Sequence, residues 1–272
     1  MSKSFALFNM SGGVGKTTLT QNLGYHLATD FGLNVLLADL DPQASLTTFM
    51  GYPPFDYEKT IADSLLSPTS FPLPVESNTE WCDLAPANIY LAQCEVELHS
   101  KIQRELCLKK VLEQVKDTYD VILIDCPPSL GELSINCISA VDYLIIPIQT
   151  EYKSLEATLN LLQTTYEITQ AVNPGLSVLG VVPTMYSHQL VQHKESINEI
   201  HSVFESLREN DLYARTSVYS PIPRSTNFAD AARRHLPLAL FKAKHPAILP
   251  IQKIAQDIAT HLTQTAETFV SV

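Results

Sequence analysis

The stretch from residue 9 to residue 18, NMSGGVGKTT, constrains the fold of this chain more than any other part of it. Its glycines leave the main chain free to turn tightly and to point N–H groups at phosphate oxygens. Lys16 adds a cation, and Thr17 adds a hydroxyl that can ligate magnesium. A loop of this kind lies between a buried strand and the first turn of a helix. The sequence therefore predicts an α/β fold that binds a nucleoside triphosphate.

The residues on both sides of this loop have the patterns that such a fold requires. Residues 5 to 9 read as a buried strand, and Leu19, Leu23 and Leu27 recur at the spacing of one helical face, which we expect to end near Gly32. The run VLLAD, residues 35–39, is continuously apolar and ends in an acid, as a parallel strand buried on both faces does. We therefore expect Asp39 at the carboxyl edge of the sheet, beside the phosphates.

Strand and helix patterns continue to alternate along the rest of the chain. VILID, residues 121–125, ends in an acid followed by two prolines, which is a Walker B position. Further strands are expected near 82–85, 143–148 and 178–182, with helices at 61–66, 91–116 and 191–207 and an irregular excursion over 52–80. This alternation predicts a doubly wound, mainly parallel sheet. At 272 residues, we expect a single domain that spans 1–272.

The cysteines and the apolar runs of the sequence indicate where in the cell the protein is found. The five cysteines have neither C-x-x-C pairing nor metal-type spacing, so we expect reduced, mostly buried thiols and a reducing cytosol. No run of about 18 apolar residues occurs, so we expect a protein that neither spans a membrane nor is secreted. The cytoplasm is the predicted location.

Three motifs in order resemble one family of ATPases: GGVGKTT, then DLDPQ at 39–43, then DCPPSLG at 125–131. The strict pattern G-x-x-x-x-G-K-[ST] is not met because position 10 is methionine. The chain instead resembles the ParA/MinD family, whose phosphate loop is called a deviant Walker A motif. The resemblance implies ATP and Mg²⁺ as cofactors. It also implies that the loop residues bind the nucleotide, namely Ser11, Gly12, Gly13, Val14, Gly15, Lys16, Thr17 and Thr18.

The same resemblance implies roles for individual side chains. Asp41 would serve hydrolysis, together with Lys16. Thr17 would ligate magnesium directly, and Asp39 and Asp125 would organise it through water. VVPTMY at 181–186 and PIPRSTNFADA at 221–231 resemble the family's nucleoside-side segments. They suggest nucleoside contacts from Thr184, Met185, Pro221 and Pro223, with a plain strand end or rigid turn as the alternative.

Ser11 departs from the family pattern. Members of the family carry a lysine there, which reaches the partner's phosphates across a nucleotide-sandwich dimer, and a serine hydroxyl cannot replace that charge. Three interpretations follow: hydrolysis is severely slowed, the dimer forms in a different way, or another cation has replaced the missing lysine. Our candidate for the last case is Lys153, just past the predicted strand 143–148, at the sheet edge where ligands bind. The alternative is an ordinary exposed lysine at the start of a helix.

A serine at this place, together with TEYKSLEAT, PRSTNFADA and PLALFKAKHPA, resembles a narrower group within the family, the McdA ATPases that distribute carboxysomes. The resemblance implies an ATP-dependent homodimer that binds nucleoid DNA without sequence preference. It also implies a small cargo adaptor of the McdB kind, which stimulates hydrolysis and release. The near alternative is a plasmid or chromosome partition ATPase.

The distribution of charge agrees with a nucleic-acid partner although the net charge is −11. The segment 208–253 holds eight Lys/Arg and three acids, a balance of +5, which leaves −16 on the rest. By resemblance, Arg224 is a DNA contact, whereas a second family arginine is replaced in the region of His188 and Gln189. We expect DNA contacts from Arg224, Arg233, Arg234, Lys242 and Lys244, with a solvated basic face as the alternative.

Other function classes have less support. A septum-site ATPase would need a basic amphipathic tail for the membrane, but residues 254–272 contain no Lys or Arg, so we expect no membrane partner. A nucleotide-binding module without hydrolysis is the other rival, because of Ser11. A metabolic ligase or reductase would need a substrate pocket or cluster cysteines, for which the sequence gives no signal.

Overall fold

The computed structural model describes residues 2–77, 81–150 and 153–270, without the side chains of 153–159 and 263–270. Within these ranges, seven strands form one parallel sheet in the order β3-β2-β4-β1-β5-β6-β7. Their bounds are β1 (Lys3–Leu7), β2 (Val35–Asp39), β3 (Asp83–Ala85), β4 (Val121–Asp125), β5 (Tyr143–Gln149), β6 (Ser177–Thr184) and β7 (Ser217–Val218). The doubly wound parallel sheet predicted from the sequence is confirmed.

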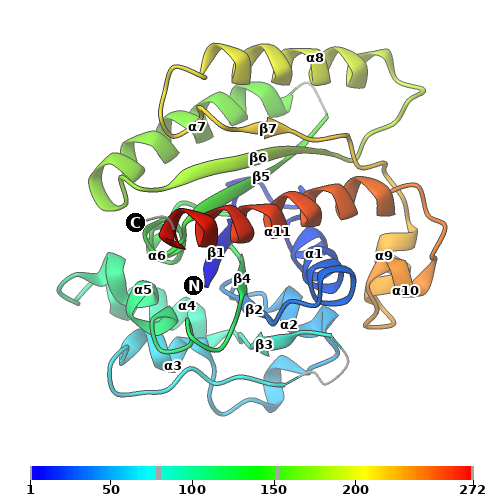
Figure 1. Ribbon diagram of the computed structural model, residues 1–272. Coiled ribbons are helices and arrows are strands. Elements are labelled where there is room, and N and C mark those ends of the chain that lie inside the picture. Colours follow the sequence, from blue (N-terminus) through cyan, green and yellow to red (C-terminus); the bar gives the residue numbers. More distant parts are fainter. Residues whose placement is uncertain (1, 78–80, 151–152, 271–272) are drawn as a thin grey trace.

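Helices connect the strands and cover both faces of the sheet (Figure 1). They are α1 (Lys16–Phe31), α2 (Ser45–Phe49), α3 (Ile61–Leu66), α4 (Tyr90–Leu98), α5 (Cys107–Leu112), α6 (Glu132–Ala140), α7 (Lys153–Val172), α8 (Val191–Ser206), α9 (Asn227–Ala232), α10 (Leu238–Phe241) and α11 (Ile248–Val270). Two short 3₁₀ helices are η1 (Pro54–Asp56) and η2 (Arg104–Leu106). Within the described residues, no helix is long and apolar enough to cross a membrane.

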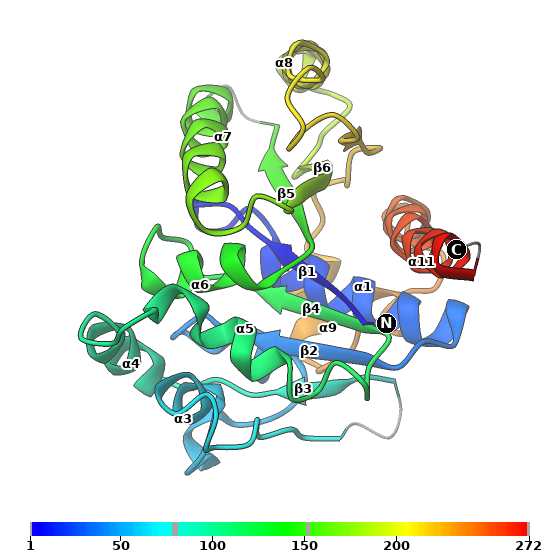
Figure 2. The ribbon, with the colours of Figure 1, turned by 60° about the vertical axis from the view of Figure 1, so that its left-hand side comes forward.

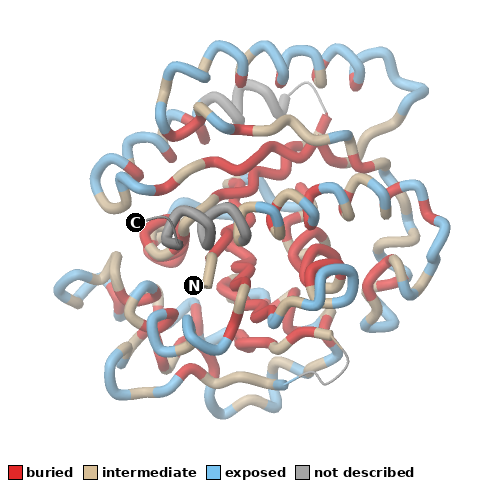
Figure 3. Tube along the Cα trace, viewed as in Figure 1, coloured by how far each residue is buried: buried red, intermediate tan, exposed pale blue. Residues whose placement is uncertain are grey.

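Alternation along the strands divides the core into two layers. In β1, Phe5 and Leu7 pack on one face, whereas Ala6 contributes to the other. Helices α1 and α11 cover the first face, and the helices from α3 to α8 cover the second, as Figure 2 shows. The central strands and α1 are therefore mostly buried, whereas the edge strand β7 is only partly buried (Figure 3). The sheet is thus a rigid base for the loops at its carboxyl edge.

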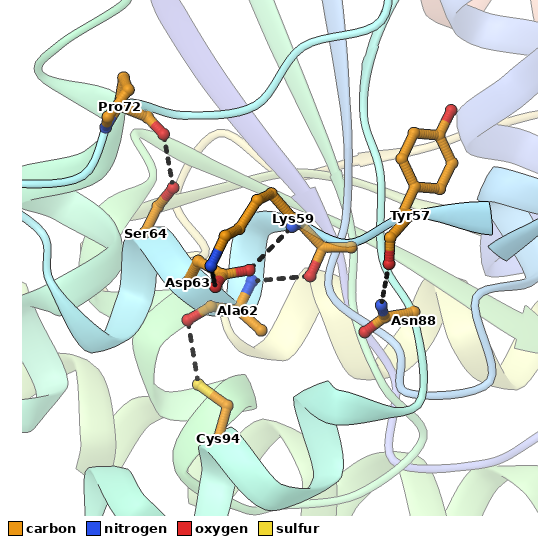
Figure 4. A network of polar contacts seen from close by, with 9 residues as sticks. Tyr57, Lys59, Ala62, Asp63, Ser64, Pro72, Asn88 and Cys94 are labelled. Carbon is orange, nitrogen blue, oxygen red and sulfur yellow. Dashed lines mark hydrogen bonds and ion pairs between the residues drawn. The ribbon is translucent and has the colours of Figure 1, made fainter. Parts of the chain in front are cut away.

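The excursion after α2 is irregular, as predicted, and polar contacts join its parts to one another and to Asn88 in the loop after β3 (Figure 4). Asn88 Nδ2 donates to the Tyr57 carbonyl at 3.3 Å, and Ser64 Oγ donates to the Pro72 carbonyl at 3.1 Å. These bonds satisfy main-chain groups that have no partner in a helix or strand. The short helix predicted at 61–66 has those bounds in the structure.

The single long helix predicted at 91–116 is wrong. The chain forms α4, then a turn and η2, then α5. Gln103 has a left-handed main chain (φ 55°), which no continuous helix contains, and the apolar Ile102 beside it is 92 % exposed. The apolar spacing continues across the turn because both short helices pack on the same face, so the pattern could not mark the break.

Candidate functional site

The phosphate loop joins β1 to the first turn of α1. Gly13 (φ 74°) and Gly15 (φ 95°) have left-handed main chains, which a side chain at either position would strain. Ser11, Gly12 and Gly13 are exposed, and the N-cap residue of α1, Gly15, has no side chain that could cap the first turn. The N–H groups of that turn are therefore free to bind a phosphate anion, at the end of the helix dipole that favours negative charge.

Side chains from neighbouring strand ends hold the loop in this shape. Gln149 Nε2 donates to the Gly13 carbonyl at 3.0 Å, and Thr184 Oγ1 donates to the Val14 carbonyl at 2.9 Å. The sequence analysis missed Gln149, for which the only signal was its place directly after a predicted strand. Both bonds fix the loop before any ligand arrives, which lowers the entropy cost of binding.

Lys16 is buried within the loop that it serves. Its Nζ donates to the main-chain carbonyls of Asn9 at 2.8 Å and Ser11 at 3.0 Å. Burial lowers the pKa of this ammonium, and the charge of Asp125 partly offsets that effect. The cation is thus held against the exposed glycines, where a phosphate would bind.

Asp125 and Thr17 form a group of oxygens suited to a magnesium ion. Thr17 Oγ1 donates to Asp125 Oδ2 at 2.6 Å, and Asp125 Oδ1 is buried and has no hydrogen-bond partner among the described residues. Burial raises the pKa of the Asp125 carboxyl well above its usual value, and the neighbouring Asp39 raises it further. A partnerless buried carboxylate oxygen beside a hydroxyl fits a hard divalent cation, directly or through its water.

Asp39 lies opposite Asp125 on the adjacent strand but has different contacts. Its Oδ2 accepts from both the N–H and the hydroxyl of Thr47, each at 2.8 Å, and its Oδ1 accepts from the Asp41 N–H at 3.1 Å. Burial raises the pKa of Asp39 to about 6, while these bonds oppose the shift. Asp39 therefore holds the turn that carries Asp41, and its role toward a magnesium water stays a prediction.

Asp41 is the more accessible of the two carboxylates in this turn. Its Oδ1 accepts from the Gln43 N–H at 2.9 Å, and the side chain is only partly buried. This geometry leaves the carboxylate open to water at the carboxyl edge of the sheet. The role of Asp41 in hydrolysis stays a prediction.

A mostly apolar pocket of about 250 Å³ opens beside the phosphate loop. Thr18, Thr184, Met185 and Pro223, all predicted from the sequence, line it, whereas Pro221 is not among the lining residues. Gly15, predicted as part of the phosphate loop, also lines the pocket. The other lining residues were not predicted individually, and they are Leu19, Phe49, Ile222, Ser225, Phe228, Ala229 and Ala232. An apolar pocket next to a phosphate site can hold a nucleoside.

The structure describes Ser11 in full but not the side chain of its candidate replacement, Lys153. Ser11 is exposed at the loop, where its side chain carries no charge. Lys153 is the first residue of α7, just past the end of β5, but its side chain lies outside the described part of the chain. Its role as a replacement cation therefore stays a prediction.

The five basic residues predicted to contact DNA are all exposed. Arg224 follows Pro223 of the pocket, and Arg233 and Arg234 follow α9, which also lines the pocket. Arg234 lies over the ring of Phe241 at 5.3 Å. Lys242 and Lys244 come directly after α10. The basic residues and the pocket therefore share one stretch of chain.

Comparisons with known proteins agree with this site. The AAA domain family matches residues 2–178. The chain is 36% identical to the chromosome-partitioning ATPase Soj of Treponema pallidum, over 95% of this chain and 97% of that protein. A similar structure is cobyrinic acid a,c-diamide synthase of Mycobacterium smegmatis with a bound ATP analogue and magnesium. It has 29% identity and a TM-score of 0.81, and the match covers 97% of this chain and 96% of that one.

A further structural neighbour is the ATP complex of the D38A variant of McdA from Cyanothece. It has a TM-score of 0.80 at 24% identity, and the match covers 96% of each chain. At this identity the likeness supports the fold alone. ATP and magnesium are bound by proteins of this fold, and the phosphate loop, the oxygen pair and the pocket fit both.

Proposed function

Because the chain belongs to the ParA/MinD family of ATPases, we propose that it is an ATP-switched positioning ATPase. Two copies close around ATP, the dimer binds nucleoid DNA without sequence preference, and a cargo-bound adaptor stimulates hydrolysis and release. The cytoplasm, at the nucleoid, is its place of action. One observation carries the proposal: five exposed basic residues lie in the stretch of chain that lines and follows the nucleotide pocket, on a chain whose net charge is −11.

For the cargo, we propose the carboxysome, reached through a small adaptor of the McdB kind. Ser11 and the motifs shared with the McdA group support this choice. The relative Soj, a chromosome-partitioning ATPase, favours partition of a chromosome or plasmid instead. Both proposals use the same nucleotide switch, and they differ only in which adaptor binds.

We propose a role for each group at the nucleotide site. Magnesium, when bound, would neutralise the charge of the phosphates. Thr17 and Asp125 would hold the ion, and Lys16 would bind the phosphate oxygens from within the loop. Asp41 would orient water for attack and hold its proton. Asp39 keeps the turn of Asp41 in place through two main-chain N–H groups, those of Asp41 and Thr47.

The first test is sedimentation of Asp41→Ala protein with ATP, with ADP and without nucleotide, each alone and with random-sequence duplex DNA. The variant traps the ATP state because its hydrolysis is blocked. We expect a dimer with ATP only, and we expect this dimer to shift the DNA. A monomer under all three conditions would contradict the proposal and favour a nucleotide-binding module, which steady-state phosphate release by the unmodified protein would in turn exclude.

Lys153 has its own test. If it supplies the cation absent at Ser11, Lys153→Ala abolishes ATP-dependent dimerisation but spares ATP binding by the monomer. Lys59→Ala serves as the control, because Lys59 is an exposed lysine paired with Asp63. Dimerisation of Lys153→Ala at the level of the control would show that Lys153 has no such role.

A further inference from the structure

Two long-range hydrogen bonds tie the basic segment 233–244 to helices that begin at the nucleotide site. The ring of His235 bonds through Nδ1 to the main-chain carbonyl of Thr48 in α2, at 2.9 Å. Asn22 Oδ1 in α1 accepts from the main-chain N–H of Leu238 at 2.7 Å. The segment therefore does not move independently of α1 and α2.

The contact of His235 is specific in its geometry. A carbonyl can only accept, so Nδ1 carries the hydrogen and donates to Thr48. His235 has a left-handed main chain (φ 58°). Gly51, also left-handed (φ 91°), packs against it so closely that a Cβ at residue 51 would lie 3.3 Å from the His235 Cβ. The ring is thus fitted against the end of α2.

Three consecutive residues of α2 contact Asp39, His235 and the nucleoside pocket, respectively. The N–H and hydroxyl of Thr47 bind Asp39, the carbonyl of Thr48 accepts from His235, and Phe49 lines the nucleoside pocket. A second bond, from Gln21 Nε2 to the Phe49 carbonyl at 2.9 Å, fixes α2 to α1. A displacement of α2 at any of these places reaches the others, because the helix has only five residues.

We propose that α2 transmits the state of the nucleotide site to the basic segment 233–244 through His235. This makes His235 a positioning residue that links the affinity for a polyanion such as duplex DNA to the bound nucleotide. The choice of DNA as the ligand rests on the proposed function. The contacts between α2 and His235 are observed in the structure whether or not the protein binds DNA. Allosteric coupling of this kind changes affinity by about 5-fold to 150-fold.

The test compares two substitutions at His235. His235→Gly removes the hydrogen bond and tolerates the left-handed main chain, whereas His235→Asn tolerates it too and keeps an N–H donor one bond from Cγ. The affinity for a fluorescent random-sequence duplex is measured with a non-hydrolysable ATP analogue and with ADP. We expect the ratio of the two affinities to fall at least about 5-fold in His235→Gly and to be largely retained in His235→Asn.

Further readouts separate this role from others. The affinity of His235→Gly for ATP, measured with a fluorescent analogue, should equal that of the unmodified protein. Arg233→Ala should weaken DNA binding with both nucleotides but leave the ratio of the two DNA affinities unchanged. Amide hydrogen exchange over 233–244 provides the readout that needs no DNA. Protection there should depend on nucleotide in the unmodified protein and lose that dependence in His235→Gly.

The outcomes distinguish the two proposals. An unmodified protein that binds no duplex in either state contradicts the proposed function, and hydrogen exchange then decides the coupling alone. A ratio and an exchange pattern in His235→Gly equal to those of the unmodified protein would overturn the role of His235.

Discussion

Asp39 and Asp125 end adjacent strands, and their main chains are paired, yet their carboxylates are satisfied differently. All the bonds of Asp39 come from the protein, whereas one oxygen of Asp125 has no partner among the described residues. An unsatisfied buried group costs about 1–3 kcal/mol, and more when it is charged. We therefore expect Asp125 to reduce the stability of the ligand-free protein, as residues kept for binding commonly do.

This difference predicts opposite effects on stability and activity for Asp125→Asn. The amide has nearly the same shape, can still accept from Thr17, and removes the charge that burial and Asp39 disfavour. We expect the free energy of unfolding without nucleotide to rise by about 1–3 kcal/mol, and magnesium-dependent hydrolysis to be lost. Urea denaturation and phosphate release measure the two effects.

Asp41→Asn is the matched control for stability. Asp41 is only partly buried, so the same change there should leave the free energy of unfolding near that of the unmodified protein. A less stable Asp125→Asn protein would show that Asp125 supports the fold through contacts of its charge.

The sequence predicted which residues gather at the site but not how each is bonded. Glycines, lysine and carboxylates have signatures because their chemistry restricts them to a few spacings. The bonds from Gln149 and Thr184 to the phosphate loop have no signature, because they join residues more than a hundred positions apart. Phe49 was not predicted as a pocket residue, because an apolar residue in a short helix is usually interpreted as part of the hydrophobic core.

At the scale of elements, the strands were the most predictable part. VLLAD and VILID have the predicted bounds in β2 and β4, because burial on both faces demands an unbroken apolar run. The failure at 91–116 has a physical cause in the turn at Gln103, which joins α4 to η2 and α5. A turn that keeps both helices on one face leaves the helical spacing of apolar residues intact.

The close approach of α1 to β2 predicts the effect of Gly24→Ala. A Cβ at Gly24 would lie 2.7 Å from Leu37 Cδ2 and 3.2 Å from Cys82 Sγ, both fully or almost fully buried. Overpacking costs about 1–3 kcal/mol, and the better helix propensity of alanine offsets up to about 1 kcal/mol. We expect a net loss of about 1–2 kcal/mol in urea denaturation.

Gly175→Ala is the control for this change, because the nearest atom to a Cβ there is Asn173 Oδ1 at 4.0 Å. Its free energy of unfolding should stay within about 0.5 kcal/mol of the unmodified protein. Equal effects at the two glycines would contradict the packing argument.

At the scale of the whole molecule, the asymmetry of charge governs binding to nucleic acid. The segment 208–253 has a balance of +5 within a chain of −11, so we expect DNA to bind at this segment and to be repelled by the acidic remainder of the chain. Four to six phosphate contacts per dimer would give a slope of about −4 to −5 for log affinity against log salt concentration.

Arg224→Ala tests this prediction, because a dimer would lose two phosphate contacts and the slope should become shallower by about 1.8. Titrations of a random-sequence duplex at several salt concentrations measure it, with the Asp41→Ala protein and ATP as the background. Lys59→Ala is the control, since that lysine lies outside the basic segment and pairs with Asp63. An equal change of slope in both variants would mean that overall charge, and not a defined surface, binds the DNA. Binding that does not depend on salt would contradict phosphate recognition itself, because release of counterions accompanies every such contact.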